Sequence, residues 1–112
     1  MQALKDQVAV VTGAGRGIGR AIALAFAEAG ADVVCLSRTT ENAEKVASEI
    51  RGLGRRAWAR ALDVSNSAEV SAAAAWVLEQ TARVDVLVNN AGVTRDGLLV
   101  RMSDSDWDTV LN

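Results

Sequence analysis

Three residue types are missing from this 112-residue chain: histidine, tyrosine and proline. Without histidine and tyrosine, the chain lacks two of the side chains that most often donate or accept protons in enzymes. It also has a single cysteine, Cys35, which lies in an apolar run. One cysteine excludes an intrachain disulfide and suits a reducing compartment, so we expect Cys35 to be a core residue.

Net charge and long hydrophobic runs are also limited. The formal net charge of −2 at pH 7 gives no strong field that would attract nucleic acid or an anionic membrane. No apolar run approaches the roughly 20 residues that cross a bilayer, and the N-terminus has no secretory hydrophobic region. We therefore expect a cytoplasmic protein without a nucleic-acid, membrane or metal partner.

The residues that are present predict a single α/β domain over 1–112. Half of the chain is apolar, which is enough for a core. Strand-like runs alternate with helical periodicity, and this pattern predicts a parallel sheet with helices on both faces. Right-handed crossovers give the strand order 3-2-1-4. The expected strands lie at 7–12, 32–37, about 58–62 and 84–89, and the expected helices at 17–29, 40–53, 67–82 and from about 103 or 105.

Several details of packing can be predicted from the same pattern. Ser67 can cap the third helix. The third strand should be a sheet edge with one wetter face, because Trp58, Arg60 and Leu62 alternate with alanines. The fourth strand should be the other, exposed edge, through which two copies could associate. The inward residues expected in the first two helices are Ile18, Ile22, Ala25, Phe26 and Ala29, then Ala43, Val46, Ala47 and Ile50.

The most informative segment is 12–19, which reads T-G-A-G-R-G-I-G and follows an apolar run. A glycine-rich turn between a strand and a helix leaves backbone N–H groups unpaired at the positive end of the helix dipole, where an anion can bind. The spacing T-G-x-x-x-G-x-G differs from the common G-x-G-x-x-G fingerprint. It predicts a phosphate-binding turn, and a plain tight turn is the alternative.

Three other polar segments follow predicted strands: Arg38, Asp63 with Val64, and 89–92. The carboxyl ends of parallel strands meet at the edge of the sheet where ligands bind in open α/β folds. Each segment also has a purely structural interpretation, since Asp and Asn favour turns after strands. Together with the glycine-rich turn, they predict a nucleotide site at this edge.

These motifs resemble the short-chain dehydrogenase/reductase family, whose Rossmann domain carries T-G-x-x-x-G-x-G after its first strand and N-N-A-G after its fourth. Within that family, segment 93–102 and Trp107 resemble the 3-oxoacyl-[acyl-carrier-protein] reductases. The resemblance covers only the amino-terminal half of such an enzyme. It implies half of a doubly wound domain, truncated before the catalytic segment, from an oxidoreductase that reduces 3-oxoacyl thioesters on acyl carrier protein.

The resemblance also implies roles for individual residues. Thr12 would brace the turn, Ile18 would give a backbone contact near the nicotinamide, and Asp63 with Val64 would contact adenine. Segment 89–92 would steady the fourth strand beside the adenine ribose. The full predicted cofactor-binding set is Thr12, Gly13, Gly15, Arg16, Gly17, Ile18, Gly19, Arg38, Asp63, Val64, Asn89, Ala91 and Gly92.

The preferred cofactor can be argued from charge. An acidic residue at the end of the second strand would pair with a free ribose hydroxyl and repel a 2′-phosphate, but Ser37 stands there. Arg38 follows it and Arg16 lies in the glycine-rich turn, so two guanidinium groups can bind a phosphate. We therefore predict NADPH over NADH. The alternative is that both arginines are solvated surface charges.

The catalytic groups that the resemblance implies are a Ser, an Asn and a Tyr-x-x-x-Lys pair, with Tyr as the general acid. The chain has no tyrosine, and its lysines, Lys5 and Lys45, lie far upstream. When Trp107 is aligned with the family pattern, the expected catalytic Asn falls two positions beyond Asn112. Asn112 itself is therefore assigned no role. We therefore predict no catalytic residue in this chain, and no activity of the isolated polypeptide.

Other interpretations stay open at this point. The chain could be an excised or designed half-Rossmann fragment that binds nucleotide without catalysis, or a regulatory module with a vestigial phosphate turn. A P-loop NTPase is set aside because G-x-x-x-x-G-K-[ST] is absent. A group of arginines around the third strand could dock an acidic carrier protein or form a solvated face: Arg51, Arg55, Arg56 and Arg60.

Overall fold

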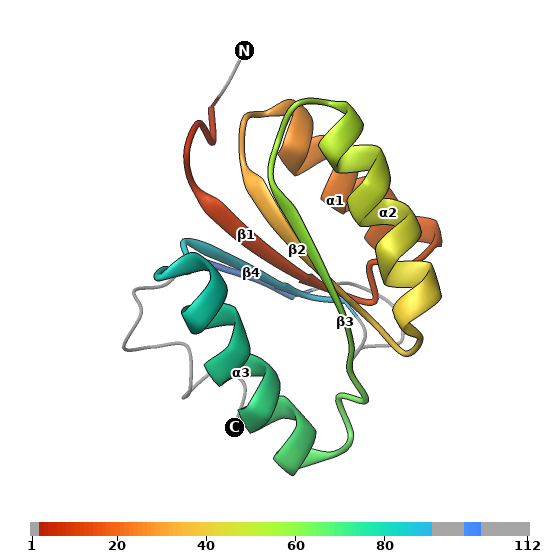
Figure 1. Cartoon of the computed structure of the whole chain (residues 1–112). Helices are drawn as coiled ribbons and strands as arrows, with labels where there is room; N and C mark the ends of the chain where they lie inside the picture. The colour runs from red at the N-terminus through yellow and green to blue at the C-terminus, as the bar shows by residue number, and fades with distance from the viewer. Residues whose placement is uncertain (1–2, 91–97, 102–112) are drawn as a thin grey trace.

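The computed structural model describes residues 3–90 and 98–101, which form a five-stranded sheet of order β3-β2-β1-β4-β5 (Figure 1). The first four strands are parallel, which confirms the predicted α/β class and the order 3-2-1-4. The elements are β1 (Val8–Thr12), α1 (Gly17–Glu28), β2 (Asp32–Ser37), α2 (Thr40–Gly52), β3 (Ala57–Ala61), α3 (Ser67–Thr81), β4 (Val86–Asn89) and β5 (Leu98–Arg101).

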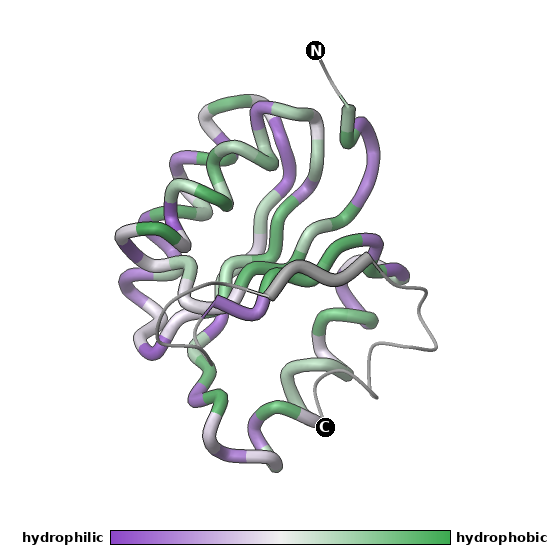
Figure 2. Tube along the Cα trace, turned by 180° about the vertical axis from the view of Figure 1, so that it is seen from behind, coloured by the Kyte–Doolittle hydropathy of each residue, from purple (hydrophilic) through white to green (hydrophobic). Residues whose placement is uncertain are grey.

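Helices cover both faces of the sheet. Figure 1 shows α1 and α2 on one side and α3 on the other. The core is correspondingly divided, since Ala9 and Val11 of β1 pack toward α1 and α2 while Val8 and Val10 pack toward α3. A strand buried on both faces needs an almost wholly aliphatic sequence, and all of β1 is buried. The hydrophobic colouring accordingly follows the strands between the helical layers (Figure 2).

Cys35 is a core residue, as predicted, and lies fully buried in β2. Burial raises the pKa of its thiol to about 12, partly offset by the positive charge of Arg51.

In the described ranges, no helix is both long and apolar enough to cross a bilayer.

The predicted inward face is correct for α2 and only partly correct for α1, where Ile22 and Phe26 pack against the core. All four residues predicted for α2 are buried. In α1, however, Ile18 and Ala25 are exposed, and Ile22 and Phe26 are only partly buried. Small residues allow α1 to lie close against the sheet, and larger side chains would hold it away. The residues of α1 that are buried are Gly19, Ala23 and Ala27.

The cap of α3 also differs from the prediction. Asn66, not Ser67, is the N-cap residue, and its Oδ1 accepts a hydrogen bond of 3.1 Å from the backbone N–H of Glu69. Asn and Ser are equally good N-caps, so the sequence alone could not choose between neighbouring positions. The helix ends at Thr81, and its C-cap residue Ala82 takes a left-handed conformation with φ of 64°.

The prediction that β4 is an open edge is wrong. β5 pairs antiparallel with β4, with Val86 opposite Arg101 and Asn89 opposite Leu98. The predicted self-association through a free β4 edge is therefore excluded, because β5 occupies that edge. That the chain forms oligomers stays a prediction. The prediction that β3 is an edge strand is confirmed. The helix expected from 103 or 105 lies outside the described residues.

Ion pairs occupy the amino ends of the strands. Asp32, which is only 6% exposed, accepts hydrogen bonds from the backbone N–H of Arg56 at 3.0 Å and from its Nε at 3.2 Å. Arg55 lies 3.4 Å from the same carboxylate, and Arg51 donates to the Ala57 carbonyl and to Glu44. These arginines hold the α2–β3 connection in place, which favours a structural role over a docking surface for a carrier protein.

Candidate functional site

A cavity of about 450 Å³ opens at the carboxyl ends of β1 and β2. Segments that are distant in sequence form its walls: the glycine-rich turn after β1, the β2–α2 connection and the residues after β3. This is the edge of the sheet where the sequence predicted a nucleotide. The cavity is lined by Thr12, Gly13, Gly15, Arg16, Leu36, Ser37, Arg38, Thr39, Asn42, Leu62 and Val64.

The glycines of the turn are needed for two different physical reasons. Gly13 and Gly17 have φ of 65° and 59°, a region that other residues rarely adopt. Gly19 is required by close approach instead, because a Cβ there would lie 1.8 Å from the carbonyl oxygen of Gly13. A Cβ at Gly15 would lie 2.6 Å from Oγ of Ser37. The turn is thus packed directly against both α1 and the end of β2.

The N-terminus of α1 differs from those of the other helices. Thr39 and Asn66 cap α2 and α3 with their side chains, and each of those helices has a glutamate in its first turn. No described side chain caps α1, whose N-cap residue is Arg16, and its first turn holds no acidic residue. Its first backbone N–H groups therefore keep their capacity to bind an anion.

Thr12 and Asn89 act as a brace between β1 and β4. Oγ1 of Thr12 lies 3.3 Å from the Val88 carbonyl oxygen and 3.1 Å from Oδ1 of Asn89. Thr12 also lines the cavity, whereas Asn89 does not. This contact ties the start of the glycine-rich turn to the neighbouring strand. The predicted site residues Ala91 and Gly92 lie outside the described residues.

Asp63 lies beside the cavity, and Val64 lines it. Oδ1 of Asp63 accepts hydrogen bonds from Oγ of Ser65 at 2.6 Å and from its backbone N–H at 3.0 Å. These two bonds lower the pKa of Asp63 below its ordinary value, and the positive charge of Arg38 adds a smaller effect, against some desolvation. Asp63 therefore forms the Asx turn that was its structural alternative. The carboxylate of Asp63 remains available for a ligand through Oδ2, because Oδ1 accepts both of these hydrogen bonds.

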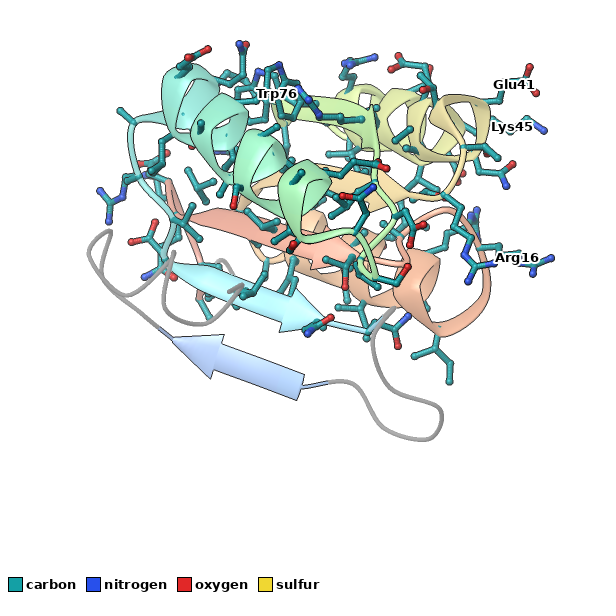
Figure 3. All side chains as sticks on the ribbon, turned by 90° about the horizontal axis from the view of Figure 1, so that it is seen from below. Arg16, Glu41, Lys45 and Trp76 are labelled. Carbon is teal, nitrogen blue, oxygen red and sulfur yellow. The ribbon has the colours of Figure 1, made fainter. Side chains whose placement is uncertain are left out.

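The lining residues carry charge of one sign only. Arg16 and Arg38 are both exposed at the cavity, and none of the lining residues is a carboxylate. Figure 3 shows Arg16 extending from the glycine-rich turn into solvent. Ser37, at the end of β2, is nearly buried. The cavity is thus suited to a polyanion.

The structure brings six of the predicted residues onto the cavity wall: Thr12, Gly13, Gly15, Arg16, Arg38 and Val64. Gly17, Ile18 and Gly19 form the start of α1 beside it, and Ile18 is 66% exposed. The sequence analysis did not assign Leu36, Thr39, Asn42 or Leu62. Only their position could have identified them, since these residues lie near strand ends that the sequence analysis had already placed at the site.

Within the described ranges, no group of three or more His, Cys, Asp or Glu side chains could hold a metal ion. The residues fit a dinucleotide by a different criterion. Gly13, Gly15 and Arg16 line the cavity, so the backbone of the glycine-rich turn forms part of its wall, and the adjoining helix lacks a side-chain cap. Close backbone approach and free N–H groups are what a pyrophosphate requires.

Known proteins share both the sequence and the fold of this chain. Residues 7–112 match the family model for short chain dehydrogenases. The chain is 41% identical over 109 residues to the 3-oxoacyl-[acyl-carrier-protein] reductase FabG of Thermotoga maritima, covering 97% of this chain and 44% of that protein. It is 45% identical over 108 residues to the short-chain reductase protein NovJ of Streptomyces niveus, covering 96% and 41%. The chain thus spans less than half the length of these relatives.

Two solved structures show the same arrangement. A hydroxysteroid dehydrogenase from Escherichia coli superposes with a TM-score of 0.77 at 44% identity, covering 80% of this chain and 37% of that one. A 7α-hydroxysteroid dehydrogenase in complex with NADH and 7-oxo glycochenodeoxycholic acid gives a TM-score of 0.72 at 41% identity, covering 77% and 34%. With the family match over almost its whole length, the chain belongs to the short chain dehydrogenase family.

Proposed function

We propose that this chain is the NADPH-binding part of a short-chain reductase that acts on 3-oxoacyl thioesters of acyl carrier protein. The observation that carries the proposal is a cavity beside an uncapped helix N-terminus, with two guanidinium groups and no carboxylate among its lining residues. The substrate class rests on relatives with that activity in their names, such as the FabG proteins of Thermotoga maritima and Staphylococcus aureus.

Each part of the site has a distinct task in this proposal. The N–H groups of the turn and of α1 hold the pyrophosphate, and Thr12 keeps the turn in register with β4. Asp63 and Val64 receive the adenine, while Arg16 and Arg38 bind the 2′-phosphate. The bound nicotinamide supplies the hydride. The segment 89–92 would line the ribose side.

The cofactor preference follows from the two arginines on the cavity wall. A phosphate on the ribose gains charge-assisted hydrogen bonds from the two arginines and meets no acid at Ser37. A relative in this family is known in complex with NADH, so the family does not fix the preference by itself. For this chain, the residues around Ser37 favour NADPH.

The test is a titration of the 112-residue chain with NADPH and with NADH, followed by calorimetry and tryptophan fluorescence. The wild-type chain should bind NADPH more tightly. Arg38→Asp should weaken NADPH binding by about 2 kcal/mol, or thirtyfold, because a charged hydrogen bond is replaced by repulsion. NADH affinity should be retained.

The matched control is Lys5→Asp, which makes the same charge change at an exposed residue that precedes β1 at the opposite end of the strand. It should leave both affinities unchanged. Equal losses for the two cofactors in Arg38→Asp would contradict the assignment of the 2′-phosphate. A folded wild-type chain that binds neither cofactor would contradict the proposal as a whole.

We further propose that the chain alone does not reduce ketones. Protonation of the product oxygen needs a positioned acid, and the sequence supplies neither tyrosine nor histidine. The purified chain should oxidise no NADPH with a 3-oxoacyl thioester above a no-protein control. Measurable turnover would show that a group within these residues donates the proton. The cytoplasmic location and the carrier-protein partner stay predictions.

A further inference from the structure

We propose that Asn42 is a specificity-determining residue that contacts the 2′-phosphate together with Arg16 and Arg38. This inference rests on the proposed function and extends it to a residue in the first turn of α2. Asn42 is half-buried and lines the cavity that both arginines also line. It is the only amide side chain among the lining residues, so its NH₂ group adds two hydrogen-bond donors to this wall.

The first argument is a direct contact with the glycine-rich turn. A Cβ placed at Gly15 would lie 2.7 Å from Cβ of Asn42 and 2.6 Å from Oγ of Ser37. The backbone of the turn therefore rests against Asn42, and Arg16 is the next residue along that backbone. The position of Asn42 is itself fixed, because its backbone N–H donates to Oγ1 of Thr39 at 3.3 Å.

The second argument is an unused hydrogen-bonding group. In the described part of the chain, no hydrogen bond is formed by the side-chain amide of Asn42, although its backbone is paired. A half-buried amide on a cavity wall gains most from a ligand that accepts its protons. A phosphate oxygen is such an acceptor, and the two guanidinium groups nearby favour the same anion.

The test uses adenosine 2′,5′-bisphosphate and 5′-AMP, which differ only in the 2′-phosphate. Asn42→Ala keeps the Cβ that packs on Gly15 and removes the amide. It should weaken binding of the bisphosphate by about tenfold and leave 5′-AMP unchanged. Asn42→Asp keeps the shape of the side chain but replaces a hydrogen-bond donor with a negative charge that repels the phosphate. It should therefore weaken binding of the bisphosphate by about a hundredfold.

Two features keep the test independent of folding. An aspartate in the first turn suits the helix dipole, so Asn42→Asp should fold at least as stably as the wild type. Ser48→Asp adds the same charge at an exposed site on the same helix and should leave both affinities unchanged.

Each remaining outcome has a distinct meaning. Equal losses for both ligands would overturn the phosphate contact and leave Asn42 as a support for the turn. Unchanged affinities in both variants, with the wild type preferring the bisphosphate, would overturn this inference but not the NADPH assignment. A wild-type chain that binds neither ligand would overturn both.

Discussion

The two ends of the parallel strands use arginine in opposite ways. At the amino ends, Arg55 and Arg56 pair with the nearly buried Asp32, and Arg83 pairs with Asp85, whose Oδ2 also accepts the backbone N–H of Val8 at 2.8 Å. At the carboxyl ends, Arg16 and Arg38 line a cavity that has no carboxylate in its wall.

This difference separates structural from functional charge. A paired arginine is satisfied by the protein and fixes a chain connection, whereas a guanidinium on a cavity wall without carboxylates can gain its partner from a ligand. The glycines follow the same division, because the tight contacts of Gly15 and Gly19 lie at the carboxyl ends. Changes at the two ends should therefore affect different measurements.

The largest effect is expected at the carboxyl end from Gly19→Ala. A Cβ 1.8 Å from the Gly13 oxygen must displace the turn or α1, and overpacking of this kind costs about 3 kcal/mol. Cofactor binding should be lost, because the N–H groups of the turn no longer converge. Thermal unfolding and NADPH titration measure the two consequences.

The matched control is Gly52→Ala at the end of α2. A Cβ there would meet nothing within 4 Å, and Gly52 has no positive φ. This variant should be neutral or more stable by about 0.5 kcal/mol, because alanine restricts the unfolded chain. If Gly19→Ala and Gly52→Ala changed the stability equally, the close approach between Gly19 and the Gly13 oxygen would not explain the need for glycine.

A smaller effect, on stability alone, is expected at the amino end from Asp32→Asn. It removes the carboxylate that holds Arg55 and Arg56 and should destabilise the fold by about 2 kcal/mol. Because the cavity is at the other end of the sheet, NADPH affinity of the folded protein should not change. Denaturant unfolding and calorimetry give the two values.

Asp6→Asn provides the comparison for that variant. The side chain of Asp6 is 76% exposed and lies 3.6 Å from Arg55, so its loss should cost less than about 0.5 kcal/mol. A loss of NADPH affinity in Asp32→Asn, measured where the protein is folded, would mean that the two ends are coupled.

The smallest effect is a shift in the titration of Asp63. Ser65→Ala removes the hydroxyl that contributes most to the lowered pKa, so the pKa should rise. It should stay below the ordinary value, since the backbone N–H at residue 65 still donates. Because the folded pKa is lowered, the stability from the ionised group is present above the unfolded pKa and is lost as pH falls through the folded value.

Carbon-detected NMR of the carboxyl group follows this titration directly. Arg38→Ala is the companion variant and should give a smaller rise, because the charge of Arg38 is a lesser cause. A larger rise in Arg38→Ala than in Ser65→Ala would show that charge, not the Asx turn, controls Asp63.

Several structural features could be predicted because their signals are local. The period of the apolar residues in α2 gave its buried face correctly, and the glycine spacing after β1 gave the turn. In α1 the same reasoning was only partly correct, since hydrophobicity favoured Ile18, which is exposed, while Gly19 is buried. Size, not hydrophobicity, decided which face lies on the sheet.

The sequence by itself determined the order of the strands and helices from β1 to β4, the glycine-rich turn after β1 and the lack of a tyrosine or histidine acid, since these depend on residue type and short-range spacing. Only the tertiary structure decided that β5 covers β4, that Asp32 holds the α2–β3 connection and that Asn42 lies against Gly15. These contacts join residues far apart in the chain, and their geometry depends on how whole elements pack, which no local pattern encodes.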